Sequence, residues 1–307
     1  MGFPASTART GGIAVALALV AVYLIWGSTY LGIRFALEGG WPPLLMAGIR
    51  FVVAGGAFYA FLRLRGVPAP TRAQWPTIVA MGVLLLGMGN GLVCVAEQTV
   101  SSGMAAVAVA SAPLWMALFS ALRGEKPTRI EWAGLAIGFV GVAWLNADGS
   151  LSASRTGLIA LLVAPIAWAF GSIWSRGRDL PSPFMTAAAQ MLVGGLLITA
   201  AGWLLGERFD GMPTFKGTLA VAYLASFGSI VGFSAYIWLL HNVRAALAGS
   251  YAYVNPAIAV LLGAWLAHER FSGSELVAMG VILLGVVAIN LARARKARPA
   301  KQARAAA

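Results

Sequence analysis

The stretch Ser250-Tyr251-Ala252-Tyr253-Val254-Asn255-Pro256 lies inside the apolar run from Ala245 to Ala267. Proline has no backbone N–H and clashes with the carbonyl four residues before it, so a helix must kink or open there. A carbonyl freed in hydrocarbon, or an amide such as Asn255, is tolerated only against protein or a watery cavity. The stretch predicts a membrane helix interrupted at a buried site, and a packing kink between helices is the plainer alternative.

A second stretch resembles the first. Ala110-Ser111-Ala112-Pro113-Leu114-Trp115 lies at the same place in another apolar run, from Ser101 to Leu122. Two matched, interrupted helices in two halves of a chain are the best indication that a sequence gives of a transporter's binding site. Pro113 and Pro256 are therefore our predicted hinges.

The composition indicates a membrane protein with several spans. Of the 307 residues, 60% are hydrophobic and 10% are charged, whereas soluble domains are about 25% charged. The net charge of +12 lies in short loops between apolar runs, which is the pattern of membrane topology and does not indicate a nucleic-acid partner.

The predicted fold class is all-α, because each span requires about 20 apolar residues and ten runs qualify. They are 12–36, 43–62, 75–96, 101–122, 130–146, 157–174, 183–205, 218–240, 245–267 and 275–292. The basic tail, residues 293–307, is predicted to be disordered and to lie against anionic lipid headgroups.

The charges of the loops predict the orientation. With the amino terminus in the cytoplasm, one side holds the tail and Arg9, Arg63, Arg65, Arg72, Arg123, Lys126, Arg129, Arg176, Arg178 and Arg244. The other side holds only Arg155, Arg208, Lys216 and Arg270. Positive loops stay in the cytoplasm, so we expect both termini there.

The two halves of the chain repeat each other, as residues 1–146 and 147–292. Trp26 matches Trp168, Pro113 matches Pro256, and the series Glu131, Gly141, Asn146 matches Glu275, Gly285, Asn290. Five spans per half is an odd number, so the second half enters the membrane from the opposite side. The prediction is two inverted five-helix repeats around a central cavity.

The sequence also resembles the drug/metabolite transporter superfamily, in particular its EamA-type ten-helix exporters. The resemblance rests on Ile25-Trp26-Gly27-Ser28-Thr29-Tyr30, on Pro42-Pro43 through Gly48-Ile49-Arg50-Phe51, on Gly89-Asn90-Gly91 and on the stretch from Ser250 to Pro256. It covers essentially the whole chain, and it implies alternating access around the cavity and export of amino acids or related metabolites.

We expect polar and aromatic residues on shared helical faces to line the cavity. The predicted substrate-cavity residues are Tyr23, Trp26, Tyr30, Asn90, Ser111, Trp115, Trp168, Ser172, Tyr251 and Asn255. Two alternatives stay open, since Tyr30 at a membrane surface would belong to an aromatic belt and Asn90 could pair with a neighbouring helix.

Arg50 lies about two turns into the second predicted span, and its counterpart in the repeat is Gln190. An arginine there can extend its guanidinium to the membrane surface. The alternative is that Arg50 contacts a substrate carboxylate or fixes a helix carbonyl.

None of the ten carboxylates falls in the middle of a span, and Glu97, at the end of the third span, comes closest. Proton-coupled antiporters usually keep an embedded Asp or Glu, so a facilitator or exchanger is at least as compatible. With aromatic residues in place of a fixed counter-ion, we expect broad and weak specificity.

An enzyme is not predicted, and neither are a metal site or a cofactor, because His241 and His268 are the only histidines and both lie at helix ends. The predicted function is an exporter of amino acids or small metabolites in the bacterial inner membrane, whose partners are the substrate and the bilayer. Drug or lipophilic-cation efflux is the runner-up, and a non-transporting sensor or assembly protein is the alternative from another class. The oligomeric state stays open, and a monomer would suffice.

Overall fold

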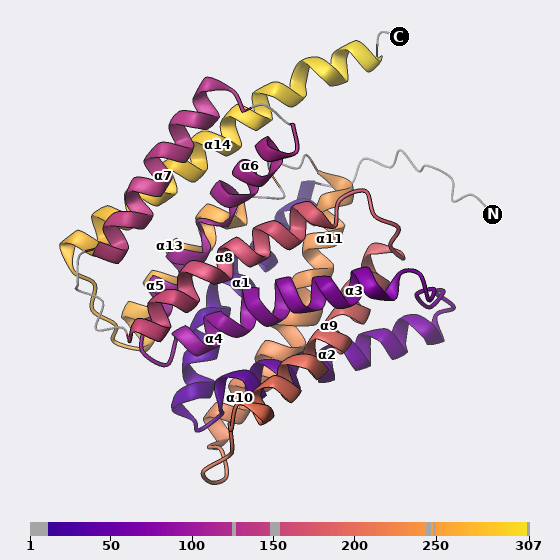
Figure 1. Cartoon of the computed structure of the whole chain (residues 1–307), viewed down its shortest axis with the longest axis vertical. Coiled ribbons are helices and arrows are strands. Elements are labelled where there is room, and N and C mark those ends of the chain that lie inside the picture. The colour runs from indigo at the N-terminus through magenta and orange to yellow at the C-terminus, as the bar shows by residue number, and fades with distance from the viewer. Residues whose placement is uncertain (1–11, 125–126, 148–153, 244–246, 248–249, 306–307) are drawn as a thin grey trace.

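The computed structural model describes residues 12–124, 127–147, 154–243, 247 and 250–305, which form a bundle of helices (Figure 1). The elements of the first half are α1 (Gly12–Glu38), α2 (Pro43–Leu64), α3 (Trp75–Met81), η1 (Gly82–Gly91), α4 (Leu92–Ala96), α5 (Ser102–Val109), α6 (Ala112–Leu122) and α7 (Arg129–Ala147). Those of the second half are α8 (Arg155–Trp174), α9 (Pro183–Leu204), α10 (Phe215–Tyr223), η2 (Leu224–Val231), α11 (Gly232–Asn242), α13 (Tyr251–Leu266) and α14 (Gly273–Ala305).

Each of the ten predicted apolar runs is mainly helical over its described residues, with small differences at the ends and with turns at residues 110–111 and 250. Seven of these helices are long and apolar enough to cross a membrane, and two further apolar helices, Val254–Leu266 and Gly273–Ile289, are shorter. The all-α, multi-span prediction is therefore confirmed.

The interrupted helices are only partly where the sequence placed them. In the first half α5 ends at Val109 and α6 begins at Ala112, so the break directly precedes Pro113. In the second half Ser250 is in a turn and α13 runs through Pro256, so the break expected at Pro256 is wrong and lies six residues earlier. At the sixth position of α13, Pro256 still removes the backbone hydrogen bond to the Ala252 carbonyl, so it weakens the helix there without ending it.

The third passage of each half contains a π-helical stretch, η1 in the first half and η2 in the second. Both stretches are rich in small residues, with Gly82, Gly87, Gly89 and Gly91 in η1 and Gly228 and Ser229 in η2. π-Helical turns are rare and occur frequently at functional sites. Their appearance at matching places is a structural mark of the repeat.

The second helices of the two halves, α2 and α9, pack against each other in opposite directions. A Cβ built on Gly48 would lie 2.2 Å from Thr199 Oγ1, and one built on Gly55 would lie 2.4 Å from the Leu192 amide nitrogen. Moving forward along α2 thus means moving backward along α9. Corresponding helices that run antiparallel are what an inverted repeat requires.

The fifth helices, α7 and α14, repeat this relation. A Cβ on Gly134 would lie 2.9 Å from the Gly285 carbonyl oxygen, and one on Gly141 would lie 2.8 Å from the Ile282 amide nitrogen. Both helices begin with a capping box: Glu131 accepts from the Thr128 N–H at 2.7 Å, and Glu275 accepts from the Ser272 N–H at 2.6 Å. The predicted equivalence of Glu131 and Glu275 is confirmed.

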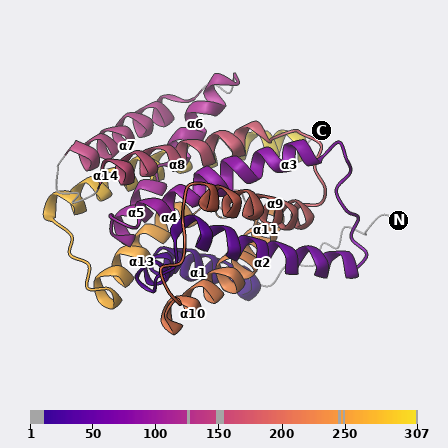
Figure 2. The ribbon, with the colours of Figure 1, turned by 60° about the horizontal axis from the view of Figure 1, so that its bottom comes forward.

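The two antiparallel pairs, α2–α9 and α7–α14, lie on opposite sides of the molecule, with α8 between them (Figures 1 and 2). Beyond the bundle, α14 continues to Ala305, which differs from the disordered tail that we expected. The reason is composition, because Ala, Arg and Lys are among the strongest helix formers.

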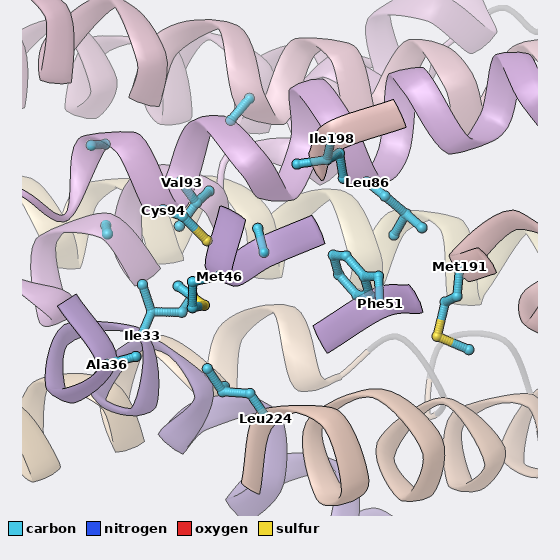
Figure 3. Close-up of a cluster of buried hydrophobic side chains, with 14 of the residues drawn as sticks. Ile33, Ala36, Met46, Phe51, Leu86, Val93, Cys94, Met191, Ile198 and Leu224 are labelled. Atoms are coloured by element: carbon cyan, nitrogen blue, oxygen red, sulfur yellow. The ribbon is translucent and has the colours of Figure 1, made fainter. Parts of the chain in front are cut away.

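The core between the pairs is built from buried apolar side chains of both halves. Met46, Leu86 and Cys94 of the first half and Met191 and Leu224 of the second half are all at most 1% exposed. Figure 3 shows these side chains converging from separate helices. The halves are thus joined by one continuous core, which fixes the helices that surround the site.

Candidate functional site

A cavity of about 150 Å³ lies where the two halves meet. Helices of both repeats line it, and its floor is continuous with the core, because Ile33, Phe51, Leu86 and Val93 belong to both and appear together in Figure 3. Its remaining lining residues are Trp26, Thr29, Tyr30, Arg50, Gly89, Asn90, Ala106, Val109, Ala110, Ala112, Pro113, Met116, Trp168, Gly228, Ser229, Phe233, Tyr251, Ala252, Asn255 and Pro256.

An aromatic cluster forms one wall of the cavity. The Trp26 ring contacts Phe233, Tyr236 and Tyr251, with centroid distances of 5.5, 5.2 and 5.0 Å. The Trp26 Nε1–H donates to the Gly228 carbonyl of η2 at 3.1 Å, so the indole has its polar atom satisfied and presents an apolar face. Because these ring contacts join α1, α11 and α13, the wall is held by both halves.

Arg50 and Asn90 form a polar centre in the lining of the same cavity. The Arg50 guanidinium donates to Asn90 Oδ1, and the Arg50 residue is 3% exposed. Its Nε has no hydrogen-bond partner among the described residues. The arginine is therefore a buried cation in the cavity, and the alternative in which it extends to the membrane surface is wrong.

Asn255 supplies a second unpaired polar atom. It is 6% exposed, lines the cavity from α13, and its Oδ1 has no partner among the described residues. A buried amide oxygen without a donor costs on the order of 1–3 kcal/mol. An unpaired donor at Arg50 and an unpaired acceptor at Asn255 in one cavity are together suited to a ligand that carries both kinds of group.

Most predicted site residues do lie at the cavity. The lining includes Trp26, Tyr30, Asn90, Trp168, Tyr251, Asn255, Arg50, Pro113 and Pro256. The belt alternative for Tyr30 is therefore wrong, since its ring faces the interior, and Asn90 proves to have a neighbouring-helix partner as well.

Four predicted lining residues lie outside the cavity. The Tyr23 hydroxyl hydrogen-bonds to Ser250 Oγ, and the Trp115 ring packs on Phe139 at 4.7 Å. The Ser111 hydroxyl donates to the Ala108 carbonyl of the preceding helix α5, and the Ser172 hydroxyl donates to the Trp168 carbonyl of its own helix. Helical spacing predicted the correct face of α1 for Trp26 and Tyr30. Tyr23 lies two turns before Tyr30 on the same helix, beyond the end of the cavity.

Sequence reasoning missed Thr29, Phe51, Met116, Ser229 and Phe233 as lining residues. Phe51 and Phe233 looked like ordinary core residues, and no polar signal separates a cavity phenylalanine from a packed one. Ser229 could have been found, because it follows Gly228 in a glycine-rich stretch of the kind already noted around Asn90.

A charged cluster joins α1, α5 and the loop after α13, and Ala106 of α5, one turn after Ser102, lines the cavity. Arg34 donates to Glu38 Oε1 at 2.8 Å and to Glu269 Oε1 at 2.6 Å. Glu269 also accepts from the Ser102 N–H, the Ser102 hydroxyl and the Gly103 N–H at 2.8, 2.8 and 3.1 Å. The Glu269 carboxylate thus caps the start of α5 and is fully satisfied.

Comparisons with known proteins agree with this architecture. The model of the EamA-like transporter family matches residues 13–147 and again residues 155–291. The chain is 48% identical over 277 residues to the uncharacterized inner membrane transporter YedA of Escherichia coli K12, covering 90% of each chain. It is 25% identical to the transporter YvbV of Bacillus subtilis, covering 92% of this chain and 93% of that one.

A solved crystal structure shares the fold, with a TM-score of 0.65 and 23% identity over 91% of this chain and 98% of the other. The two family matches, the inverted halves and the cavity between them lead to the same conclusion: this chain belongs to the EamA-like transporter family, within the drug/metabolite transporter superfamily, and is a membrane transporter.

Proposed function

We propose that this protein exports amino acids or related small carboxylates across the bacterial inner membrane by alternating access. Rocking of the two halves, with bending at Pro113 and Pro256, would open the cavity to one side at a time. The excess of positive charge in one set of loops supports a topology with both termini in the cytoplasm. The related inner membrane transporter YedA supports the membrane assignment.

The observation that carries the proposal is the buried Arg50 with its unpaired Nε. A guanidinium binds a carboxylate through two parallel, charge-assisted hydrogen bonds. No Asp or Glu lines the cavity among the described residues, so a substrate carboxylate would meet no like charge in the lining. The unpaired Asn255 Oδ1 is an acceptor for the substrate's ammonium or hydroxyl group.

The cavity also bears on the size of the substrate. Ligand pockets usually measure about 300–1,000 Å³, and this one measures about 150 Å³. A small metabolite fits only if the halves separate slightly, which is the movement that alternating access requires. The aromatic wall around Trp26 would then accept apolar side chains of different shapes, so we propose broad specificity.

The runner-up function, efflux of lipophilic cations, is favoured by the same aromatic wall through cation–π attraction. The Arg50 cation in the cavity opposes it, because two like charges at low dielectric repel strongly. The other alternative, a sensor or assembly protein, predicts no flux at all.

The test is counter-flow in proteoliposomes with a panel of labelled amino acids, their amides and labelled cationic dyes. Arg50→Gln introduces the residue that occupies the matching position, Gln190, so the fold should tolerate it. The variant should bind amino acids about 10–100-fold more weakly, as expected for losing one charge-assisted contact, with little change for the amides. The exposed Arg63→Gln is the matched control. Flux of dyes alone, or equal affinities in both variants, would contradict the proposal.

A further inference from the structure

Glu97, directly after α4, is a buried carboxyl group that no described residue satisfies. The residue is 6% exposed, and neither carboxyl oxygen has a hydrogen-bond partner. Other carboxylates that are buried in the described part of the chain are bonded. Glu269 has four donors, and Glu131 and Glu275 each close a capping box.

The surroundings of Glu97 contain charges that are already engaged. The charges of Glu269, Arg50 and Arg34 act on the Glu97 carboxyl group. Glu97 in turn interacts electrostatically with Tyr30 and Cys94. Arg34 is committed to Glu38 and Glu269, and Arg50 donates to Asn90. Helix α8 also packs against α4 and begins with Arg155, which is exposed. Neither described ion pair includes Glu97.

If Glu97 were ionised, burial of its charge would cost on the order of several kcal/mol, because no ion pair or hydrogen bond with a described residue would offset the lost hydration. A buried carboxyl group in this situation takes up a proton instead. Glu97 lies on the helical face that lines the cavity. Val93 and Asn90, one and two turns earlier on that face, are both lining residues, so Glu97 is placed to exchange a proton with the cavity. Glu269 and Arg34 of the charged cluster act on Glu97 electrostatically, so this cluster is near it as well.

We propose that Glu97 is a proton-binding site whose proton moves with the substrate during transport; this inference rests on the proposed function. In the described conformation the neutral acid is buried. When the cluster at Arg34 and Glu269 opens, water reaches the carboxyl group, its O–H bond breaks, the proton leaves as hydronium, and the carboxylate is stabilised by water and the freed Arg34.

Substrate and proton are then linked through Arg50. A substrate carboxylate on Arg50 removes the cation that would otherwise stabilise ionised Glu97, so it favours the protonated form. By reciprocity, protonation of Glu97 strengthens binding of the carboxylate. Proton and carboxylate would therefore travel in the same direction, and efflux would run down the substrate's own gradient.

The proton site itself can be tested without substrate, by infrared difference spectroscopy of the purified full chain between acidic and alkaline pH. Wild type at pH 7 should show the C=O stretch of a protonated carboxylic acid, and Glu97→Gln should lose that band. The control is Glu38→Gln, which removes a half-exposed carboxylate that pairs with Arg34. This variant should keep the C=O band. Identical spectra for wild type and Glu97→Gln would overturn the proposal.

The link to transport is tested in proteoliposomes with the labelled amino-acid panel. Wild-type flux should be faster when the substrate-containing side is acidic, and for Glu97→Gln the ratio between acidic and alkaline conditions should fall to about 1. An unchanged ratio in the variant would overturn the coupling. Absence of all flux in wild type would instead contradict the proposed function, and the infrared result would still decide whether Glu97 holds a proton.

Discussion

At the scale of single residues, the unpaired atoms carry the functional argument. Buried polar groups in native proteins are almost always hydrogen-bonded, and each exception requires an explanation. Here Arg50 Nε, Asn255 Oδ1 and the Glu97 carboxyl oxygens are exceptions close to one cavity. A ligand and a proton are the partners that explain them.

Asn255→Ala should reduce flux in proteoliposomes about 5–10-fold, the effect of losing one hydrogen bond to substrate. Its thermal midpoint in detergent should hardly change, because Oδ1 has no protein partner to lose. Asn90→Ala is the contrast, since it strands the buried Arg50 and should lower the midpoint. Normal flux in Asn255→Ala would show that the substrate path lies elsewhere.

At the scale of elements, glycines set the distance between the paired helices. On α14, a Cβ at Gly285 would lie 2.6 Å from the Gly134 carbonyl oxygen and from Gly138 Cα, whereas a Cβ at Gly280 meets nothing within 4 Å. Close backbone approach of this kind drives helix association where no hydrophobic effect acts between helices.

Gly285→Ala should therefore separate α7 from α14 and destabilise the protein by about 1–3 kcal/mol. Gly280→Ala, on the same helix, should be neutral or stabilising by about 0.5–1 kcal/mol through helix propensity alone. Thermal unfolding in detergent measures both changes. Equal effects of the two substitutions would contradict the close packing of α7 and α14 at Gly285.

At the scale of the whole molecule, each half has an odd number of predicted spans, so the two halves enter the membrane from opposite sides. The whole protein then has one defined orientation in the membrane. The cavity lies where the halves meet, and the cluster of Arg34 and Glu269 joins them at one end. Movement of one half against the other would break this cluster and open the cavity there.

The orientation can be measured by cysteine labelling. Cys94 is the only cysteine, so Cys94→Ser provides a background without thiols. In that background, Gly211→Cys should react with a membrane-impermeant maleimide in intact cells. Arg65→Cys should react only in inverted vesicles, because the positive loops stay in the cytoplasm. The reverse pattern would mean that the protein is inserted the other way and would contradict the predicted topology.

The sequence by itself determined the class, the ten apolar runs and the repeat, because spans, charge asymmetry and matched residues such as Glu131 and Glu275 are local patterns. It also gave most of the lining, since Trp26, Tyr30 and Asn90 lie on one face of their helices. Which polar atoms are left unpaired could be seen only in the folded structure. It shows that Arg50 points to Asn90 and not to a lipid headgroup, and that no described residue donates to Glu97. Both outcomes depend on contacts between helices far apart in the chain. The same holds for Tyr23 and Trp115, which have the residue type and spacing of lining residues. In the structure Tyr23 contacts Ser250 and Trp115 contacts Phe139, so neither side chain faces the cavity.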